Sequence, residues 1–221
     1  MATLYIVATP IGNMEDVSKR ALRILSEVDL ILCEDTRETR KLLERHEIKK
    51  PLISYHQHSK LEKVEEIVSF LKSGKDLALV SDAGTPGISD PGNALIAEIV
   101  KEDLEVSIVP LPGPSALISA ASASGFAMDR FTFLGFPPTK KKRKKFFEEV
   151  ANSIYPVIFY ESTYRIRRSL EEMEPLILGR DVVVCRELTK KFETIYRGSI
   201  EKILTEIDER GEFVVIVNKK N

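Results

Sequence analysis

The sequence contains few of the side chains that form disulfides, bind metals or act as nucleophiles. Its 221 residues include two cysteines, three histidines and no tryptophan. Cys33 and Cys185 each lie alone inside an apolar stretch with strand character, so we interpret both as buried apolar side chains rather than as a disulfide. H-E-x-x-H and paired C-x-x-C patterns are absent, and the sequence therefore predicts no metal site.

Long hydrophobic stretches are absent as well. No apolar run approaches the roughly 20 residues that a transmembrane helix needs. The N-terminal residues 1–5 lack the basic start and the cleavage site of a signal peptide. With 43% apolar and 30% charged residues, the composition is typical of a soluble chain with one large domain or two small ones. We therefore predict a cytoplasmic protein with no membrane partner.

Charge of one sign is not in excess. The formal net charge is −1, which argues against a protein that coats nucleic acid without specificity. Two local clusters depart from this average: six consecutive cations at residues 140–145, and a second group formed by Arg165, Arg167 and Arg168. Such patches can hold a polyanion locally. A merely solvated surface is the alternative interpretation of the lysine run.

The glycine fingerprints of common nucleotide-binding folds are missing too. The sequence has neither G-x-G-x-x-G nor G-x-x-x-x-G-K-[ST]. The histidines His46, His56 and His58 have no partner motif with a nucleophilic serine or cysteine, which weakens hydrolase interpretations.

What the sequence does contain is a long loop, residues 81–92, with three glycines, two prolines and two aspartates. It follows the apolar run 77–80 and precedes a helical pattern at 93–101, so we place it at the carboxyl end of a buried strand, where open α/β sheets bind ligands. Its glycines permit close approach of backbone to a ligand. The alternative is an ordinary turn with Asp90 as helix cap, but such turns take roughly two to six residues and this loop is longer.

Strand and helix signals alternate through the first half of the chain, which predicts a parallel sheet with helices on both faces. In the second half several strands follow one another without helices between them, which predicts a mixed sheet. The expected strands are residues 4–8, 30–33, 52–54, 77–80, 106–109, 131–136, 157–160, 182–185, 194–196 and 213–217.

The predicted fold class is therefore α/β with two domains. Residues 1–111 form an N-terminal parallel-sheet, Rossmann-like domain, and residues 112–221 form a C-terminal mixed-sheet α/β domain. The boundary falls in the segment 110–114, where proline and glycine are dense.

Each of the first five strands is followed by an unusual loop. Because the carboxyl ends of parallel strands lie along one edge of a sheet, we expect these loops to form one rim. Two of them have ordinary alternatives: residues 34–37 as a helix start capped by Asp35 or Thr36, and residues 55–58 as an exposed polar loop. The loops are residues 9–13, 34–37, 55–58, 81–92 and 112–116.

A series of motifs runs in order along the chain: Thr9–Asn13, Glu34–Arg37, Ser81–Gly92, Pro112–Ala116, Phe133–Pro137, Phe159–Ser162, Arg186–Glu193 and Gly211–Phe213. On these motifs, in a match that spans residues 4–217, the chain resembles the tetrapyrrole methylase superfamily. Within it, the chain is similar to the branch that methylates small-subunit ribosomal RNA. One departure is Tyr164, which stands where members of the family usually have a histidine.

The resemblance implies S-adenosylmethionine as methyl donor, held in a cleft between two α/β domains of a homodimeric enzyme. It implies 2′-O-methylation of a cytidine ribose in the decoding region of 16S rRNA, so the partner is that RNA or the small ribosomal subunit. Carried over residue by residue, it implies cofactor contacts from Pro10, Asp82, Ala83, Gly84, Ile88, Ser89, Asp90, Ser115, Ala116, Phe159, Tyr160, Leu188 and Phe213.

A ribose hydroxyl is a weak nucleophile, so a general base is expected to assist it. The candidates by residue type are Glu34, Asp35, Glu187 and His56, and the sequence leaves the choice open. Basic side chains are the candidates for phosphate contacts with the RNA: Arg37, Lys140, Lys141, Lys142, Arg143, Lys144, Lys145, Arg165, Lys190 and Lys191.

Three other functions remain open at this point. The first is methylation of a tetrapyrrole ring or of a protein side chain by a member of the same superfamily. The second is a non-catalytic RNA-binding module for ribosome assembly, although the sequence lacks the RNP-type aromatic pattern. The third is a nucleotide-handling enzyme of doubly wound fold, which the missing glycine fingerprints disfavour.

Overall fold

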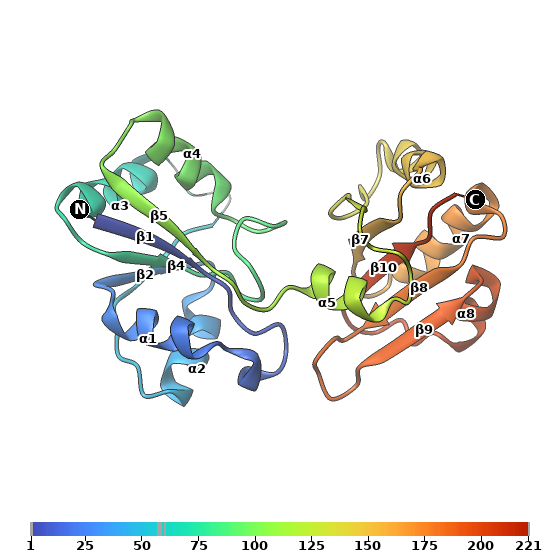
Figure 1. Cartoon of the computed structure of the whole chain (residues 1–221), viewed down its shortest axis with the longest axis horizontal. Helices are drawn as coiled ribbons and strands as arrows, with labels where there is room; N and C mark the ends of the chain where they lie inside the picture. Colours follow the sequence, from blue (N-terminus) through green and yellow to red (C-terminus); the bar gives the residue numbers. More distant parts are fainter. Residues whose placement is uncertain (1, 57–58, 60, 221) are drawn as a thin grey trace. The chain divides into compact units, whose positions relative to one another are not determined.

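A computed structural model describes residues 2–56, 59 and 61–220, and Figure 1 shows its course from the N-terminus to the C-terminus. The chain divides into two compact units between Ser115 and Ala116. The boundary expected from the sequence, after Leu111, lies at the end of the last strand of the first unit. The two units are described separately below.

The first unit is built on five parallel strands in the order β3-β2-β4-β1-β5, which confirms the predicted parallel sheet. A short 3-10 turn, η1 (Met14–Asp16), follows the first strand. In chain order the regular elements are β1 (Ala2–Val7), α1 (Lys19–Glu27), β2 (Leu30–Cys33), α2 (Thr36–Arg45), β3 (Leu52–Ser54), α3 (Leu61–Lys72), β4 (Leu77–Leu79), α4 (Asn93–Lys101) and β5 (Val106–Leu111).

Side chains on each strand of this sheet alternate between two helix-covered faces. On β2, Leu30 and Leu32 pack with α3 and α4, whereas Ile31 and Cys33 pack with α1 and α2. Figure 1 shows these two pairs of helices on opposite sides of the sheet. Both faces are therefore buried, and the strand ends are the part of the sheet where functional loops can reach the surface.

Side-chain caps fix the starts of two helices in this unit. The Ser18 hydroxyl accepts a hydrogen bond of 3.0 Å from the Ala21 N–H at the start of α1. The Asp35 carboxylate accepts one of 2.8 Å from the Arg37 N–H at the start of α2. Helix α4 begins after Gly92 without a side-chain cap, so Asp90 does not act as the helix cap that the ordinary interpretation of the long loop required.

The second unit contains a mixed five-stranded sheet in the order β6-β7-β10-β8-β9, as predicted. Strands β6 and β7 are parallel, and the other neighbours are antiparallel. In chain order its elements are α5 (Ala116–Ala123), β6 (Thr132–Phe133), α6 (Arg143–Asn152), β7 (Val157–Glu161), α7 (Ile166–Ile177), β8 (Val182–Arg186), β9 (Thr194–Gly198), α8 (Ile200–Glu206) and β10 (Phe213–Val217).

Strand β6 is shorter than the predicted 131–136. Gly135 has a φ of 65°, a left-handed conformation that extended strands do not adopt, and prolines follow it at residues 137 and 138. The backbone still follows β7 for a short distance, because the Tyr160 N–H donates to the Gly135 carbonyl over 2.8 Å.

The two faces of the second sheet are covered unequally. Residues of α6, α7 and α8 pack on one face, where Phe147 and Phe159 are fully buried. The short helix α5 packs on the other face through Leu117 and Ala120, opposite Cys185. Both cysteines are buried, as predicted. Among the described residues, no helix has the length and apolar composition needed to cross a membrane.

Candidate functional site

The long loop after β4 is hydrogen-bonded to the loops that follow its neighbours in the first sheet. The Thr9 N–H donates to the Gly84 carbonyl over 2.9 Å, and the Gly84 N–H returns a bond of 3.0 Å, so the loops after β1 and β4 form a two-bond bridge. The Asp35 N–H donates to Asp82 Oδ1 over 2.9 Å and connects the loop after β2. The predicted rim therefore exists as one hydrogen-bonded assembly.

The segment after β5 joins the same assembly. The Thr85 hydroxyl donates to the Pro114 carbonyl over 3.1 Å. The Thr9 hydroxyl donates to the Ser81 carbonyl, also over 3.1 Å. Three of the other four predicted loops are thus hydrogen-bonded directly to residues 81–92.

Two glycines give this loop a shape that other residues cannot adopt. Gly92 has a φ of 143°, and a Cβ there would lie 2.9 Å from the Leu79 side chain. Gly87 has a φ of 84°, and a Cβ there would lie 2.7 Å from Asn93 Oδ1. The Asn93 amide instead donates to the Gly87 carbonyl over 2.9 Å. The loop is therefore fixed by the backbone conformation of its glycines and by the hydrogen bond from Asn93, the first residue of α4.

Most of the predicted cofactor contacts in this loop remain accessible to a ligand. Pro10 and Gly84 are buried, and Ser115 and Ala116 are half-buried around the start of α5. The members that are at least partly exposed are Asp82, Ala83, Ile88, Ser89 and Asp90.

Carboxylates crowd together on this rim. Burial, with Glu34 and Asp82 close by, raises the pKa of Asp90 to about 6. Burial and the same Asp82 raise the pKa of Glu34. A cationic ligand group placed here would stabilise the ionised carboxylates. Within the described part of the chain, no group of three or more His, Cys, Asp or Glu side chains is arranged to hold a metal ion.

Asp35 has a different role from its neighbours. Its carboxylate accepts from the Arg37 side chain and backbone, and these bonds lower its pKa to about 2. A carboxylate this acidic is a weak proton acceptor. Asp35 therefore acts as the cap of α2 and the partner of Arg37, the ordinary interpretation that the sequence left open.

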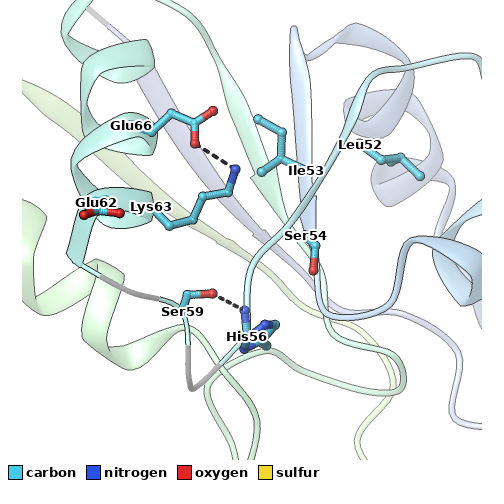
Figure 2. Close-up of a pocket in the computed structure, with 8 residues that line it drawn as sticks. All are labelled: Leu52, Ile53, Ser54, His56, Ser59, Glu62, Lys63 and Glu66. Atoms are coloured by element: carbon cyan, nitrogen blue, oxygen red, sulfur yellow. Dashed lines mark hydrogen bonds and ion pairs between the residues drawn. The ribbon is translucent and has the colours of Figure 1, made fainter.

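A cavity of about 690 Å³ lies beside β3 and the start of α3 (Figure 2). His56 is the predicted site residue on the wall of this cavity, and its backbone N–H donates to the Ser59 hydroxyl over 2.9 Å. Figure 2 also shows Lys63, whose ammonium pairs with Glu66 at 2.7 Å. Glu62 adds a second carboxylate, so the wall does not favour a phosphate. Tyr55, at the start of the predicted loop, is buried, and Gln57 and His58 lie outside the described residues.

The second sheet has a rim of its own. Phe213, the first residue of β10, pairs with Glu161 at the end of β7 and with Arg186 at the end of β8. This register brings together three motifs that are far apart in sequence: residues 159–162, 186–193 and 211–213.

Arg186 holds the loops of this second rim in place. Its side chain is buried, and its guanidinium donates to the Phe192 carbonyl over 3.0 Å and to the Arg210 carbonyl over 2.6 Å. It also pairs with Asp208 at 2.9 Å. One guanidinium therefore fixes both the loop that follows β8 and the segment that precedes β10.

Glu187 is part of a local ion-pair group. Lys190 Nζ lies 3.1 Å from Glu187 Oε1 and 2.7 Å from Glu212 Oε2. Although burial opposes ionisation of Glu187, the Glu212 N–H and the Lys190 ammonium lower its pKa. Glu187 is consequently a structural carboxylate, poorly suited to accept a proton, and Lys190 is engaged with protein carboxylates rather than open to phosphate.

Two of the predicted RNA contacts, Arg143 and Arg165, are ion-pair partners of the buried Glu161, which the sequence did not single out. Glu161 is 1% exposed, and its Oε1 lies 2.5 Å from Arg165 Nη2. Arg143 is 5% exposed, donates to the Ser169 hydroxyl over 2.6 Å and pairs with Glu172 at 2.5 Å. Arg143 therefore cannot reach a phosphate, and Arg165 is committed to Glu161. The sequence signal was an acidic residue that ends an apolar strand.

Two predicted cofactor contacts also need correction. The side chains of Phe159 and Phe213 are 0% and 2% exposed and lie in the core beneath α6, α7 and α8. A ligand therefore cannot contact these rings while the core is intact. Tyr160 and Leu188 pack on the opposite face of the sheet and are half-buried, so their role as cofactor contacts stays a prediction.

The fold and its loops correspond to a known class of protein. Residues 3–204 match the family described as Tetrapyrrole (Corrin/Porphyrin) Methylases, and the chain belongs to this family. The solved structure of a diphthine synthase matches with a TM-score of 0.77 and 15% identity, covering 100% of this chain and 91% of that one. The methyltransferase CobJ matches with a TM-score of 0.73 and 20% identity, over 99% and 95% of the two chains. These identities establish the fold alone.

Closer relatives share one name, Ribosomal RNA small subunit methyltransferase I. The chain is 43% identical to that protein of Thermotoga maritima, with 100% of both chains covered. It is 45% identical to that of Bacillus subtilis, covering 100% of this chain and 76% of the relative. It is 47% identical to that of Vibrio cholerae, covering 97% and 76%.

The methyl donor of this methylase is S-adenosylmethionine. The residues of the first rim are suited to bind such a molecule. The loop 81–92 offers exposed backbone and small side chains, and Glu34, Asp82 and Asp90 offer negative charge to a group with a cationic sulfur.

Proposed function

We propose that this chain transfers a methyl group from S-adenosylmethionine to the 2′-oxygen of a cytidine ribose in the decoding region of 16S rRNA. The observation that carries the proposal is the hydrogen-bonded rim around residues 81–92, in a chain whose relatives over nearly its full length are named small-subunit rRNA methyltransferases. Such a substrate belongs to the cytoplasm, and we extend the proposal to a homodimer.

In this proposal the loop after β4 holds the cofactor. Asp82, Ala83 and Gly84 contribute from its first half, and Ile88, Ser89 and Asp90 from its second half. The cofactor supplies an electrophilic methyl group, and the residues of the protein bind it, orient it and exclude water. Correct alignment of the two reactants can account for up to about 7–11 kcal/mol of rate acceleration.

We propose Glu34 as the acceptor of the ribose hydroxyl proton. Of the carboxylates first considered for this role, Glu34 has its pKa raised by burial and by Asp82, whereas that of Asp35 and of Glu187 is lowered. A carboxylate with a raised pKa holds a transferred proton more readily at neutral pH. Glu34 follows β2 and lies on the same rim as Asp82, so it stands beside the proposed cofactor loop.

Electrostatic contact with the RNA falls to the exposed cations. Five lysines around Arg143 are exposed, and so are Arg37 and Lys191. Arg143 itself faces the core and anchors the basic segment to Glu172, which leaves its neighbours directed outward. The cations proposed to contact phosphates are Lys140, Lys141, Lys142, Lys144, Lys145, Arg37 and Lys191.

The test combines cofactor binding with label transfer. Isothermal titration is expected to show binding of S-adenosylmethionine to the wild-type chain and none to Asp82→Ala, with unchanged circular dichroism. Tritium from the labelled methyl group is expected in small-subunit rRNA, and the modified site should resist alkaline cleavage because its 2′-oxygen is blocked. Label in a tetrapyrrole or in protein would overturn the RNA substrate. An RNA-binding chain that takes up no cofactor would overturn the enzymatic proposal in favour of an assembly module.

A further inference from the structure

The loop between β8 and β9, residues 187–193, carries an aromatic side chain that the core does not use. Phe192 is 63% exposed, whereas Leu188 and Ile195 on either side of it pack against the core beneath α5. Single exposed apolar residues are common on protein surfaces, so exposure alone assigns no role to this ring. Two further observations do.

First, the backbone that presents the ring is fixed. The buried guanidinium of Arg186 donates to the Phe192 carbonyl over 3.0 Å. The Thr189 N–H donates to the Glu193 carboxylate over 2.6 Å and closes the loop. Glu187 and Thr189 have φ values of 50° and 65°, conformations that cost free energy for residues other than glycine. A ring held by such a loop binds a partner with little further loss of backbone entropy.

Second, the surroundings of the ring are charged. Lys191 Nζ lies 5.6 Å from the centroid of the Phe192 ring, and both Lys191 and Glu193 are exposed. A protein partner would need a continuous apolar patch, which these charged neighbours interrupt. An aromatic face beside an exposed cation is instead typical of proteins that bind single-stranded nucleic acid, where a base stacks on the ring.

The ring also lies at the end of its sheet that carries the second rim. Thr194 at the start of β9 pairs with Arg186, which in turn pairs with Phe213, so the loop belongs to the second rim. We propose that Phe192 stacks on an unpaired base of the RNA substrate while Lys191 contacts a neighbouring phosphate. This inference rests on the proposed function, because it takes the substrate to be RNA with an unstacked nucleotide.

Binding of a short single-stranded RNA to the full chain tests the proposal. Loss of stacking in Phe192→Ala is expected to weaken binding about 5- to 150-fold without changing its dependence on salt, since no phosphate contact is lost. Phe192→Trp, which keeps an aromatic face, is expected to bind as the wild type does. Lys191→Gln is expected to reduce the salt slope by about 0.7. Ile154→Ala is the matched control, because Ile154 is 69% exposed just before β7, at the opposite end of the strands.

A series of oligonucleotides, each with one abasic position, locates the stacked base. In the wild type, removal of that base is expected to cost as much affinity as Phe192→Ala, and the variant is expected to lose nothing more at that position. Equal affinity of Phe192→Ala and wild type overturns the inference, as does the same abasic sensitivity in both. Failure of the wild type to bind single-stranded RNA overturns it as well.

The outcomes separate this inference from the function on which it rests. If the wild type methylates small-subunit rRNA and Phe192→Ala binds RNA normally, the stacking role alone is lost. If no label reaches rRNA, the proposed function itself is lost. Unchanged affinity of Phe192→Ala for S-adenosylmethionine shows that the variant is folded and that its cofactor site is intact.

Discussion

Replacing Glu161 by glutamine tests whether the second unit depends on a buried charge network. Glu161 accepts from the Ser162 N–H at 2.8 Å, from the Ser169 hydroxyl at 2.5 Å and from Arg165 at 2.5 Å. Arg143 lies 3.9 Å away. The glutamine amide would direct N–H groups at one of these donors, and the charge that pairs with Arg165 would be lost.

The cost follows from the geometry of the pair. Removing one partner of a buried ion pair typically destabilises a protein by about 3–5 kcal/mol. Arg143 keeps Glu172 as a second partner, so the lower end of this range, about 3 kcal/mol, is expected. For a chain of this size, that corresponds to a fall of about 6–12 °C in the melting temperature.

Guanidinium unfolding and differential scanning calorimetry measure this change directly. The control is Glu171→Gln, an exposed substitution on α7, the helix that carries Ser169, for which we expect a change within about 0.5 kcal/mol. A loss below about 1 kcal/mol for Glu161→Gln would refute the reasoning, since it would mean that the network contributes no more than a surface pair.

Four further predictions concern the first rim and the basic segment. The pKa of Asp90 rises from 3.8 to about 6 in the folded state, so between these pH values the folded chain retains a proton that the unfolded chain releases. Stability against urea should therefore fall as the pH rises through this window, and Asp90→Asn should flatten that part of the profile. Asp35→Ala should lower the temperature of thermal unfolding by removing the α2 cap, whereas Asp35→Asn should restore it. Glu34→Gln should lower kcat about 10²–10⁴-fold and remove the acidic limb of the pH–rate profile. Replacing the five exposed lysines of residues 140–145 by glutamine should reduce the salt slope of RNA binding by up to about 0.7 per lysine in filter binding, and a wild-type slope would make them solvated surface only.

The periodicity of the sequence was sufficient to predict both sheets. Leu30 and Leu32 alternate with Ile31 and Cys33, and such a short apolar run between helical patterns is typical of a strand buried on both faces. The rim followed from the same reasoning, because parallel strands end at one edge. The same reasoning predicted strand β6 too long, because the left-handed Gly135 ends the strand within an apolar stretch.

Arg143 shows where a charge run misleads. It lies at helical spacing from Phe146, Phe147 and Val150, all of which are buried on one face of α6. The spacing was visible in the sequence, but the five lysines around Arg143 made the segment look uniformly exposed. Helical periodicity, rather than local charge, decided which cation turned inward.

The sequence by itself determined the order of strands and helices, the loops that follow the parallel strands and the burial of both cysteines, because these depend on apolar periodicity and on backbone conformation over short distances. Only the tertiary structure decided which charged groups act on one another. Glu161 meets Arg143, and Lys190 meets Glu212, across separations that no local pattern records. Electrostatic energy depends on distance in space and on exclusion of water, and both are set when the sheets and helices pack.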